Sequence, residues 1–218
     1  MKVFSLAVVM FSSFYLNVAH AFIINGNFES GLTGWTTYLT PNGTAGTTGF
    51  TTSFVDADND GVLSNAFTIQ PGQVNFVSGQ YAGGGIYQSF NWAGGDLSLT
   101  ADVASYNPNL TSANGSGGLV AAYIDNLLID SFDFASITAQ SWEYTLIGGI
   151  SNLLAGVHTL RFEFTRPYLT AWYTPINYLD DVIISSQTQP VPEPSILALM
   201  GIGLAGLGFI RRRRNQSA

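Results

Sequence analysis

Hydrophobic and polar positions alternate with a period of two along much of residues 22–186. Residues 96–106 read DLSLTADVASY, with leucine, alanine or valine at every second position. Residues 156–164 read GVHTLRFEF and repeat the pattern with leucine and two phenylalanines. Successive side chains of a β-strand point to opposite faces of the sheet, so this period predicts strands with one buried face.

Shorter β-rich runs lie between Gly, Asn and Pro turns, and each run is a further predicted strand. These runs are residues 22–28, 35–39, 50–55, 64–69, 74–78, 86–92, 119–124, 142–147 and 178–185. No convincing amphipathic helix appears among them. Short strands with one apolar face predict an all-β domain over residues 22–186, folded as an antiparallel jelly-roll β-sandwich.

The N-terminus departs from this pattern. Residues 1–21 begin with a single Lys2, continue as an apolar run and end on Ala19-His20-Ala21, a small-x-small cleavage site. Together these features predict a secretory signal peptide that is removed on export. The alternative is a buried N-terminal helix, but the flanking residues and the cleavage site favour the signal peptide.

The C-terminus carries a second apolar segment. Residues 195–210 read SILALMGIGLAGLGFI and contain no charge. As a helix they extend about 24 Å, slightly less than the ~30 Å hydrocarbon core of a bilayer, and local thinning accommodates the difference. The arginines of the tail, residues 211–218, hold this end in the cytoplasm. A Pro-rich stalk, residues 187–194, joins the domain to this predicted transmembrane helix, so the domain is expected outside the cell.

Three features follow one another at the C-terminus: a Pro-Glu-Pro stretch, a short apolar segment and an arginine cluster. In this order they resemble the PEP-CTERM sorting signal. The resemblance implies cleavage by a membrane-embedded exosortase in a Gram-negative envelope that makes exopolysaccharide, with the protein at the outer surface or in the extracellular matrix. The alternative is an ordinary single-span anchor. The residues of the signal are Val191, Pro192, Glu193, Pro194, Arg211, Arg212, Arg213 and Arg214.

The domain is more acidic than the net charge of −7 for the whole chain indicates. Between residues 22 and 186 the only lysines or arginines are Arg161 and Arg166. Such a surface repels nucleic acid, so nucleic-acid binding is not expected. The acidity serves either solubility outside the cell or the binding of divalent cations. Because the chain has no cysteine, its stability must come from the core or from a metal.

Three motifs mark the beginning, the middle and the end of the domain. Residues 24–29 read INGNFE and precede Gly34-Trp35, residues 85–90 read GIYQSF, and residues 178–182 read YLDDV. In this order they resemble galactose-binding-like jelly rolls, in particular carbohydrate-binding modules of families 4, 9 and 22. The resemblance implies a five-on-four antiparallel sandwich whose first and last strands lie close together.

The same resemblance implies a structural calcium ion between the first and last strands. Its ligands would be Glu29 and Asp180, with Asp181 as the other choice. Calcium prefers hard oxygen ligands, which carboxylates and backbone carbonyls supply. Adjacent residues of a strand point to opposite faces, so only one of the two aspartates joins such a site easily. The alternative is that these aspartates cap turns or accept hydrogen bonds.

A second candidate calcium site is the sequence DADNDG at residues 56–61. Its spacing brings Asp56, Asp58 and Asp60 onto one concave face, and the glycine permits a sharp turn. An EF-hand needs glutamate at the twelfth position, which is Phe67 here, so the loop is not an EF-hand. Asp, Asn and Gly are also the residues of ordinary turns, and an acidic hairpin turn is the favoured alternative.

Sugar binding needs aromatic rings that stack on pyranose faces and polar groups that meet the hydroxyls. The glycan-binding candidates lie in a predicted loop between the last two strands: Tyr168, Trp172 and Tyr173. Further rings occupy strand positions that can face a concave surface: Tyr87, Tyr106 and Tyr123. The alternative for each ring is that it fills the core or covers a sheet face.

The sequence contains no catalytic signature. His20 leaves with the signal peptide, His158 begins a strand, and there is no cysteine nucleophile, G-x-S-x-G, H-E-x-x-H or phosphate loop. We therefore predict that the protein is not an enzyme. The expected role is either structural or adhesive, within exopolysaccharide, or that of a lectin-like module for a specific glycan. A hydrolase of envelope polysaccharide is a third alternative.

Overall fold

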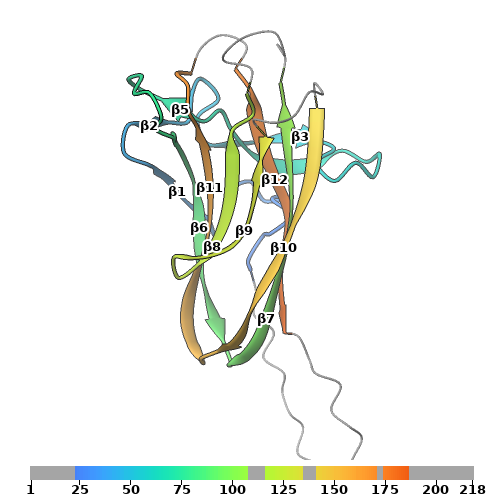
Figure 1. The fold of residues 1–218 in the computed structure, drawn as a ribbon. Coiled ribbons are helices and arrows are strands. Elements are labelled where there is room, and N and C mark those ends of the chain that lie inside the picture. The colour runs from blue at the N-terminus through green and yellow to red at the C-terminus, as the bar shows by residue number, and fades with distance from the viewer. Residues whose placement is uncertain (1–22, 108–115, 135–140, 171–173, 187–218) are drawn as a thin grey trace, which may run out of the picture. The chain divides into compact units, whose positions relative to one another are not determined.

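The computed structural model describes residues 23–107, 116–134, 141–170 and 174–186, which form two large sheets (Figure 1). The first sheet has the strand order β1-β6-β11-β8-β9, and the second sheet has the order β10-β7-β12-β4-β3. A short ribbon pairs β2 with β5. Every pair of neighbouring strands is antiparallel.

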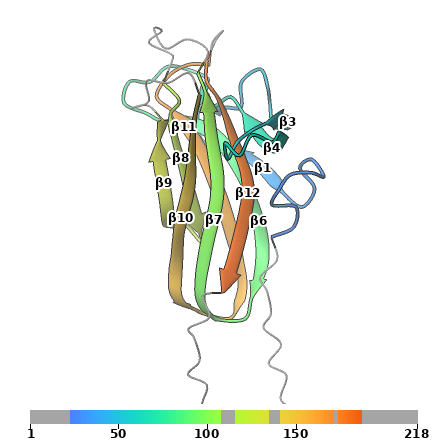
Figure 2. The ribbon, with the colours of Figure 1, turned by 90° about the vertical axis from the view of Figure 1, so that its right-hand side faces the viewer.

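The strands of the first sheet are β1 (Thr36–Leu39), β6 (Ala82–Trp92), β11 (Gly156–Arg166), β8 (Leu119–Ile124) and β9 (Leu127–Asp133). Those of the second sheet are β10 (Ser141–Leu153), β7 (Gly95–Tyr106), β12 (Ile176–Ser186), β4 (Ser64–Ile69) and β3 (Thr51–Val55). The ribbon consists of β2 (Gly43–Thr44) and β5 (Gly72–Gln73). Figure 2 shows β10, β7 and β12 of the second sheet side by side.

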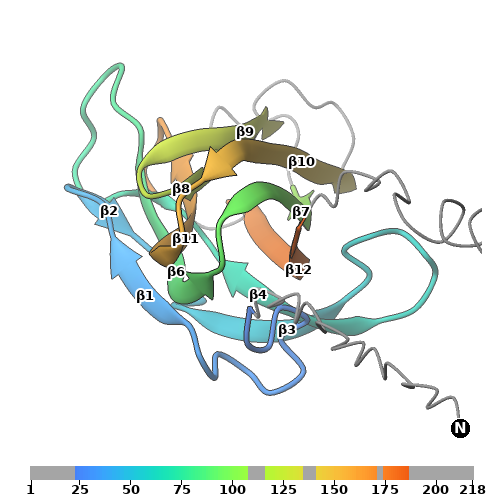
Figure 3. The ribbon, with the colours of Figure 1, turned by 90° about the horizontal axis from the view of Figure 1, so that it is seen from below.

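Figure 3 shows the two sheets viewed along the strands, and the core consists of buried apolar side chains contributed by both sheets. The odd-numbered residues of β7 from Leu97 to Ser105 and the alternating apolar residues of β11 are buried, in the phase that the period of two predicted. Aromatic rings fill the centre, where the ring of Phe67 lies near those of Phe28, Phe50 and Phe164. Burial of this apolar surface stabilises the fold without disulfides. The predicted all-β, antiparallel jelly-roll sandwich is confirmed, but each large sheet has five strands, so the five-on-four arrangement that the resemblance implied is wrong.

Most of the predicted strands are present, but two predictions are wrong and β9 was not foreseen. Residues 23–28 form turns, and residues 74–78 form a loop. β9 reads LLIDSFD, which lacks regular alternation because this edge strand is mostly exposed. It pairs with β8 across a tight turn at Asp125 and Asn126, whose φ angles of 49° and 69° suit the twist of a two-residue hairpin.

Residues 23–35 form a series of turns that link the two sheets. The side-chain amide of Gln88 in β6 accepts a hydrogen bond from Ile24 N at 2.6 Å and donates one to Ile24 O at 2.9 Å. Val182 N of β12 donates to Gly26 O at 3.0 Å. One side chain thus satisfies backbone groups that a strand ladder would otherwise use, and the predicted first strand does not form.

The loop at residues 74–81 is organised by Gln73 in a similar way. Gln73 is 1% exposed, and its Nε2 lies within hydrogen-bonding distance of three backbone carbonyl oxygens, among them that of Val77 at 3.1 Å. Its Oε1 accepts from Val77 N at 2.5 Å. These contacts replace the ladder of the predicted strand and leave Phe76 exposed.

The chain separates into two units, Met1–Ser186 and Gln187–Ala218. The predicted signal peptide, stalk and transmembrane helix lie outside the described residues. Within the part of the chain that the structure describes, no helix has the length and apolar character needed to cross a membrane.

Candidate functional site

The outer face of the first sheet carries tyrosine rings around one arginine. In the strand register, Arg161 of β11 lies between Tyr87 of β6 and Tyr123 of β8. Glu163 lies two residues further along β11 and therefore points to the same side. The side chains of β1 contribute one more ring. We call this surface the tyrosine face, and it consists of Tyr38, Tyr87, Tyr123, Arg161 and Glu163.

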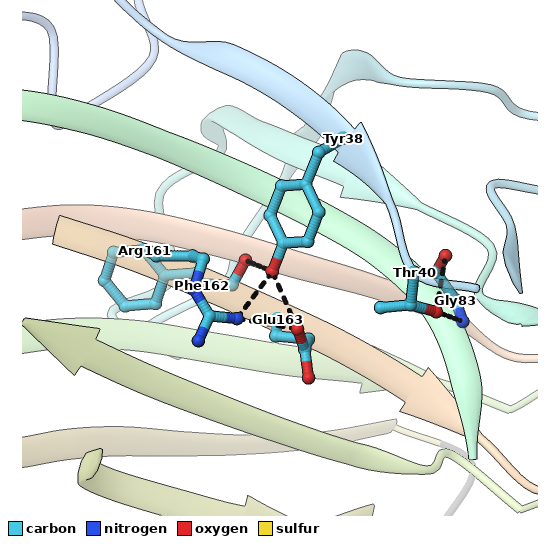
Figure 4. A network of polar contacts seen from close by, with 6 residues as sticks. All are labelled: Tyr38, Thr40, Gly83, Arg161, Phe162 and Glu163. Atoms are coloured by element: carbon cyan, nitrogen blue, oxygen red, sulfur yellow. Dashed lines mark hydrogen bonds and ion pairs between the residues drawn. The ribbon is translucent and has the colours of Figure 1, made fainter. Parts of the chain in front are cut away.

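A glycine allows the polar groups of the tyrosine face to meet across β6. Gly85 lies opposite Tyr38 on one side and opposite Glu163 on the other. A Cβ atom at Gly85 would fall 1.9 Å from the carbonyl oxygen of Phe162, so this position must remain without a side chain. The Tyr38 hydroxyl reaches over the strand and donates to Glu163 Oε2 at 3.0 Å (Figure 4).

Arg161 holds the tyrosine face together. Its Nη1 donates to the Tyr38 hydroxyl at 3.0 Å and forms an ion pair with Glu163 Oε2 at 2.6 Å. Its guanidinium carbon lies 4.0 Å from the ring centroid of Tyr123 and 5.8 Å from that of Tyr38. Charge-assisted hydrogen bonds and cation–π contacts are stronger than neutral contacts, so the guanidinium is fixed in position.

Burial and charge set the protonation states of this group. Burial raises the pKa of the Tyr38 phenol above its ordinary value of 10.0, so the hydroxyl stays protonated. Burial opposes the charge of Arg161, but the hydrogen bond to Tyr38 and the surrounding charges raise the pKa of the guanidinium. Arg161 and Glu163 cancel each other's charge. The tyrosine face therefore presents flat rings and fixed hydrogen-bonding groups without a net charge.

Such a surface has the chemistry that a pyranose ring requires. Tyrosine rings stack on the apolar face of a sugar, while a guanidinium and a carboxylate exchange hydrogen bonds with hydroxyl groups. The sequence pattern indicates Tyr87 and Tyr123 as outward strand positions but does not identify Tyr38, Arg161 or Glu163 as site residues. The alternation along β11 does place Arg161 and Glu163 on its outer side. The signal that joins all five is the register of β1, β6, β11 and β8.

The acidic loop, residues 56–61, connects β3 to β4 and packs on the outer face of the second sheet. Ala57 is 1% exposed and contacts Ala66 of β4 and Ala104 of β7. Tyr178 of β12 packs against the same small cluster. An alanine between two aspartates is thus the anchor that fixes the loop to the sheet.

The three aspartates of the acidic loop lie close together. Carboxylate oxygens of Asp56, Asp58 and Asp60 lie within 4.8 Å of one another. Asp56 also accepts hydrogen bonds from the N–H groups of Asp60 and Gly61, both at 3.0 Å. The loop therefore has the local hydrogen bonds of an Asx turn, and its carboxylates are near enough to share one cation.

Glu29 and Asp180 are held by neighbouring residues of β4. Glu29 accepts hydrogen bonds from the N–H and the side-chain amide of Asn65, at 2.9 and 3.0 Å. Asp180 is 2% exposed and accepts a hydrogen bond from the Ser64 hydroxyl at 2.5 Å. Burial raises the pKa of Asp180 to about 6, and the charges of Asp181 and Glu29 act in the same direction. The structure therefore brings these two predicted ligands near each other.

Asp181 faces the acidic loop because β12 is irregular at this point. The register of β12 against β7 shifts between Asp180 and Ile183, and Asp181 has a φ of 46°. Burial raises the pKa of Asp181, and the charges of Asp102 and of two aspartates in the acidic loop raise it further. The two predicted calcium sites thus belong to one acidic surface.

Two clefts flank the acidic loop. The larger, about 380 Å³, is lined by Asp58, Asp102, Glu143 and neighbouring residues. The smaller, about 140 Å³, shares Glu143 and is lined by Tyr106 and Tyr178. Tyr106 therefore lies on the second sheet and is not part of the tyrosine face. Of the arginines that the structure describes, none lines either cleft.

Of the three glycan-binding candidates in the loop after β11, Trp172 and Tyr173 lie outside the described residues. Tyr168 is half-buried, and the guanidinium carbon of Arg166 lies 5.9 Å from its ring centroid. Its backbone carbonyl accepts a hydrogen bond from Gln73 N at 2.9 Å. Tyr168 thus packs near the end of β11 and does not join the tyrosine face.

Both ring nitrogens of His158 make contacts within the protein. Its Nδ1 lies 2.5 Å from Asp125 Oδ2 in the β8–β9 turn, and its Nε2 lies 2.9 Å from the carbonyl oxygen of Leu154 after β10. The hydrogen bond to Asp125 raises the pKa of the imidazole. His158 thus ties two hairpins together.

Residues 190–214 match the PEP-CTERM protein-sorting motif. The predicted sorting signal is therefore confirmed, although its residues lie outside the described part of the structure. This motif marks proteins that are exported and sorted to the cell envelope or surface. The protein is accordingly an exported one.

Several solved structures are similar to the chain. The carbohydrate-binding module TmCBM61 in complex with β-1,4-galactotriose is 10% identical, with a TM-score of 0.46 over 78% of this chain and 100% of that one. A cyclase from Fischerella sp. TAU is 16% identical, with a TM-score of 0.46 over 77% of this chain and 96% of that one. A CBM4 structure is 13% identical, with a TM-score of 0.42 over 75% and 98%. No curated protein matches the sequence.

Proposed function

We propose that this exported protein binds polysaccharide through the tyrosine face and serves a structural or adhesive role in the exopolysaccharide outside the cell. The observation that carries the proposal is the arrangement of three tyrosine rings around the paired Arg161 and Glu163 on one outer surface. The sorting motif supports it, because export to the envelope brings the protein to such polymers. Processing of the tail by an exosortase belongs to the same proposal.

The expected ligand is a neutral sugar chain. Glu163 neutralises Arg161, so the face offers no net charge to a phosphate or uronate group. Tyr87 and Tyr123 lie on either side of Arg161, so rings and hydrogen-bonding groups alternate across the strands. A sugar chain that lies across β6, β11 and β8 meets both kinds of group.

Binding without catalysis fits the tyrosine face better than glycoside hydrolysis does. Hydrolysis of a glycosidic bond uses two carboxyl groups on opposite sides of the bond. Glu163 is the only acid of the tyrosine face, and both Arg161 and Tyr38 donate to its carboxylate. A hydrolase remains the alternative, and release of reducing sugar by the purified protein would favour it.

The test is a calorimetric titration of the purified protein with neutral oligosaccharides identified on a glycan array. Tyr87→Ala removes a ring of the tyrosine face, and Tyr106→Ala removes an exposed ring of the second sheet as a matched control. We expect Tyr87→Ala to weaken binding at least about tenfold and Tyr106→Ala to leave it unchanged. Equal effects of the two substitutions, or no bound glycan, would contradict the proposal.

We also propose that calcium binds the acidic surface, with Glu29 and Asp180 as one set of ligands and the acidic loop as the other. Three features support this: the carboxylate oxygens of the loop lie within 4.8 Å of one another, Asp180 is buried, and Glu29 lies near it. Calcium would supply the positive charge that these carboxylates lack, and its role would be structural.

A further inference from the structure

Two hairpins turn at the same end of the sandwich, which we call the exit end. β10 ends at Leu153, opposite Gly95 at the start of β7. β11 begins at Gly156, opposite Trp92 at the end of β6. The β6–β7 and β10–β11 hairpins therefore form neighbouring tips, which lie together at the lower end of the sandwich in Figures 1 and 2.

The tips at the exit end are apolar. The first reads Trp-Ala-Gly-Gly at residues 92–95, and the second reads Leu-Leu-Ala-Gly-Val at residues 153–157. Leu154 is 80% exposed and Val157 is 70% exposed, the two highest fractions among the large apolar side chains that the structure describes. The acid beside them, Asp96, accepts a hydrogen bond from Asn152 N at 2.8 Å. The two most exposed aliphatic side chains therefore lie together on one tip at the exit end.

The second tip is held in place by His158. Its Nε2 lies 2.9 Å from the carbonyl oxygen of Leu154, and its Nδ1 contacts Asp125. The exposed leucine is therefore presented by a fixed backbone. Little conformational entropy is lost when its side chain enters an apolar medium.

The chain leaves the sandwich at this same end. Ser186, the last residue of β12, lies opposite Leu97 at the beginning of β7. Eight residues, 187–194, separate it from the uncharged segment 195–210. Fully extended, eight residues span at most about 30 Å. A bilayer that holds the segment 195–210 therefore lies within reach of the exit end.

We infer that the exit end rests on the bilayer that holds the chain's own C-terminal segment, with Leu154 and Val157 in the interfacial region of the lipid. Two aliphatic side chains are too weak to bind a membrane alone, but a short tether turns their insertion into an intramolecular step. Once the tail is cleaved, the tip no longer holds the domain at the membrane. The inference rests on membrane insertion of residues 195–210, which belongs to the proposed sorting.

Because the chain has no cysteine, one substitution creates one labelling position. Leu154→Cys labels the exit end, and Phe76→Cys, at a 58% exposed residue before β6, labels the opposite end as a matched control. The full-length chain is reconstituted through its tail into phosphatidylcholine vesicles, and flotation checks the insertion. Each fluorophore is then quenched by a lipid that carries a spin label on its acyl chain.

We expect the label at position 154 to be quenched at least threefold more than the label at position 76. Val157→Ser in the same chain should reduce the difference. Equal quenching in vesicles that float with the protein overturns the contact and leaves the sorting proposal standing. Protein that does not float overturns the tether, and the inference with it. Concentration-dependent self-quenching at position 154 without lipid quenching assigns the surface to a second copy of the chain and equally overturns the inference.

Discussion

The buried carboxylate of Asp180 accepts a hydrogen bond from the Ser64 hydroxyl at 2.5 Å. Asn65, the next residue of β4, donates its N–H to the carboxylate of Glu29. Two acids are thus fastened to consecutive residues of β4. Burial raises the pKa of Asp180 from 3.8 to about 6. At neutral pH the ionised Asp180 therefore opposes folding unless a cation is near it.

The first prediction concerns stability without calcium. Because the folded-state pKa of Asp180 lies above its unfolded value, the contribution of this residue falls as the pH rises from about 4 to about 6. Asp180→Asn removes the charge, so in EGTA at pH 7 it should stabilise the protein by roughly 1–2 kcal/mol. Urea denaturation measures the change, and Asp96→Asn at the exit end is the control.

Calcium should reverse this order. A cation that binds only the folded state adds about 2.7 kcal/mol at a hundredfold excess over its dissociation constant. The wild-type protein should gain most of this stabilisation, whereas Asp180→Asn should gain less. Identical melting temperatures in calcium and in EGTA would contradict both proposed calcium sites.

The second prediction concerns the tyrosine face. Arg161→Met removes the ion pair with Glu163 and the cation–π contact with Tyr123. It should destabilise the protein by about 1–3 kcal/mol, because the Glu163 carboxylate loses its partner in a half-buried position. Arg161→Lys keeps the charge but not the planar fork, so its loss should be smaller. Denaturant unfolding separates the two, and equal losses would show that the guanidinium has no special part.

The third prediction is a pH dependence at His158. Its folded-state pKa is raised above 6.5, so its contribution is full below pH 6.5 and is lost as the pH rises through the folded value. Burial opposes ionisation of Asp125, but hydrogen bonds from His158 and Thr159 N lower its pKa below 3.8. The contribution of Asp125 is therefore lost only as the pH falls through that lower value.

The stabilisation by this pair should thus be greatest between about pH 4 and pH 6.5. The difference in melting temperature between the wild type and His158→Gln, taken at each pH, should be largest there and should shrink towards pH 8.5. A difference that does not change with pH would mean that His158 acts only through packing.

The fourth prediction concerns the loop that Gln73 organises. Gln73→Ala leaves three part-buried backbone carbonyls and the Val77 N–H without their side-chain partner. We expect a loss of about 2–4 kcal/mol and much faster hydrogen exchange at the Val77 amide. Gln80→Ala alters an exposed side chain of the same loop and should leave exchange at Val77 unchanged. Slow exchange in both variants would show that the loop is held by other contacts.

The fold was predictable from the sequence where one face of a strand is buried. The alternation in β7 and β11 follows directly from the pleat, so those strands and the all-β class could be read from the chain. The sequences of segments 22–28 and 74–78 are typical of strands. In the structure, however, the side chain of Gln88 forms hydrogen bonds with the backbone of Ile24, and that of Gln73 with the backbone of Val77. Gln88 lies 64 residues after Ile24, and Gln73 lies just before its loop, so neither leaves a local pattern in the segment that it holds. β9 was missed because an exposed edge strand needs no alternation.

The tyrosine face was only partly predictable. The period of two places Arg161 and Glu163 on the outer side of β11, and Tyr87 and Tyr123 on outward strand positions. Which of these side chains meet depends on strand order and register, which one sequence does not reveal. The meeting of Tyr38 and Glu163 depends further on the missing side chain of Gly85.

The turns at residues 23–35 determine the order in which the exported protein can be completed. An exported chain emerges with its N-terminus first, yet Ile24 waits for Gln88 and Gly26 waits for Val182. Residues 23–35 are therefore among the last parts of the domain to dock. Until β12 is available, Gly26 lacks the hydrogen bond that Val182 donates to its carbonyl.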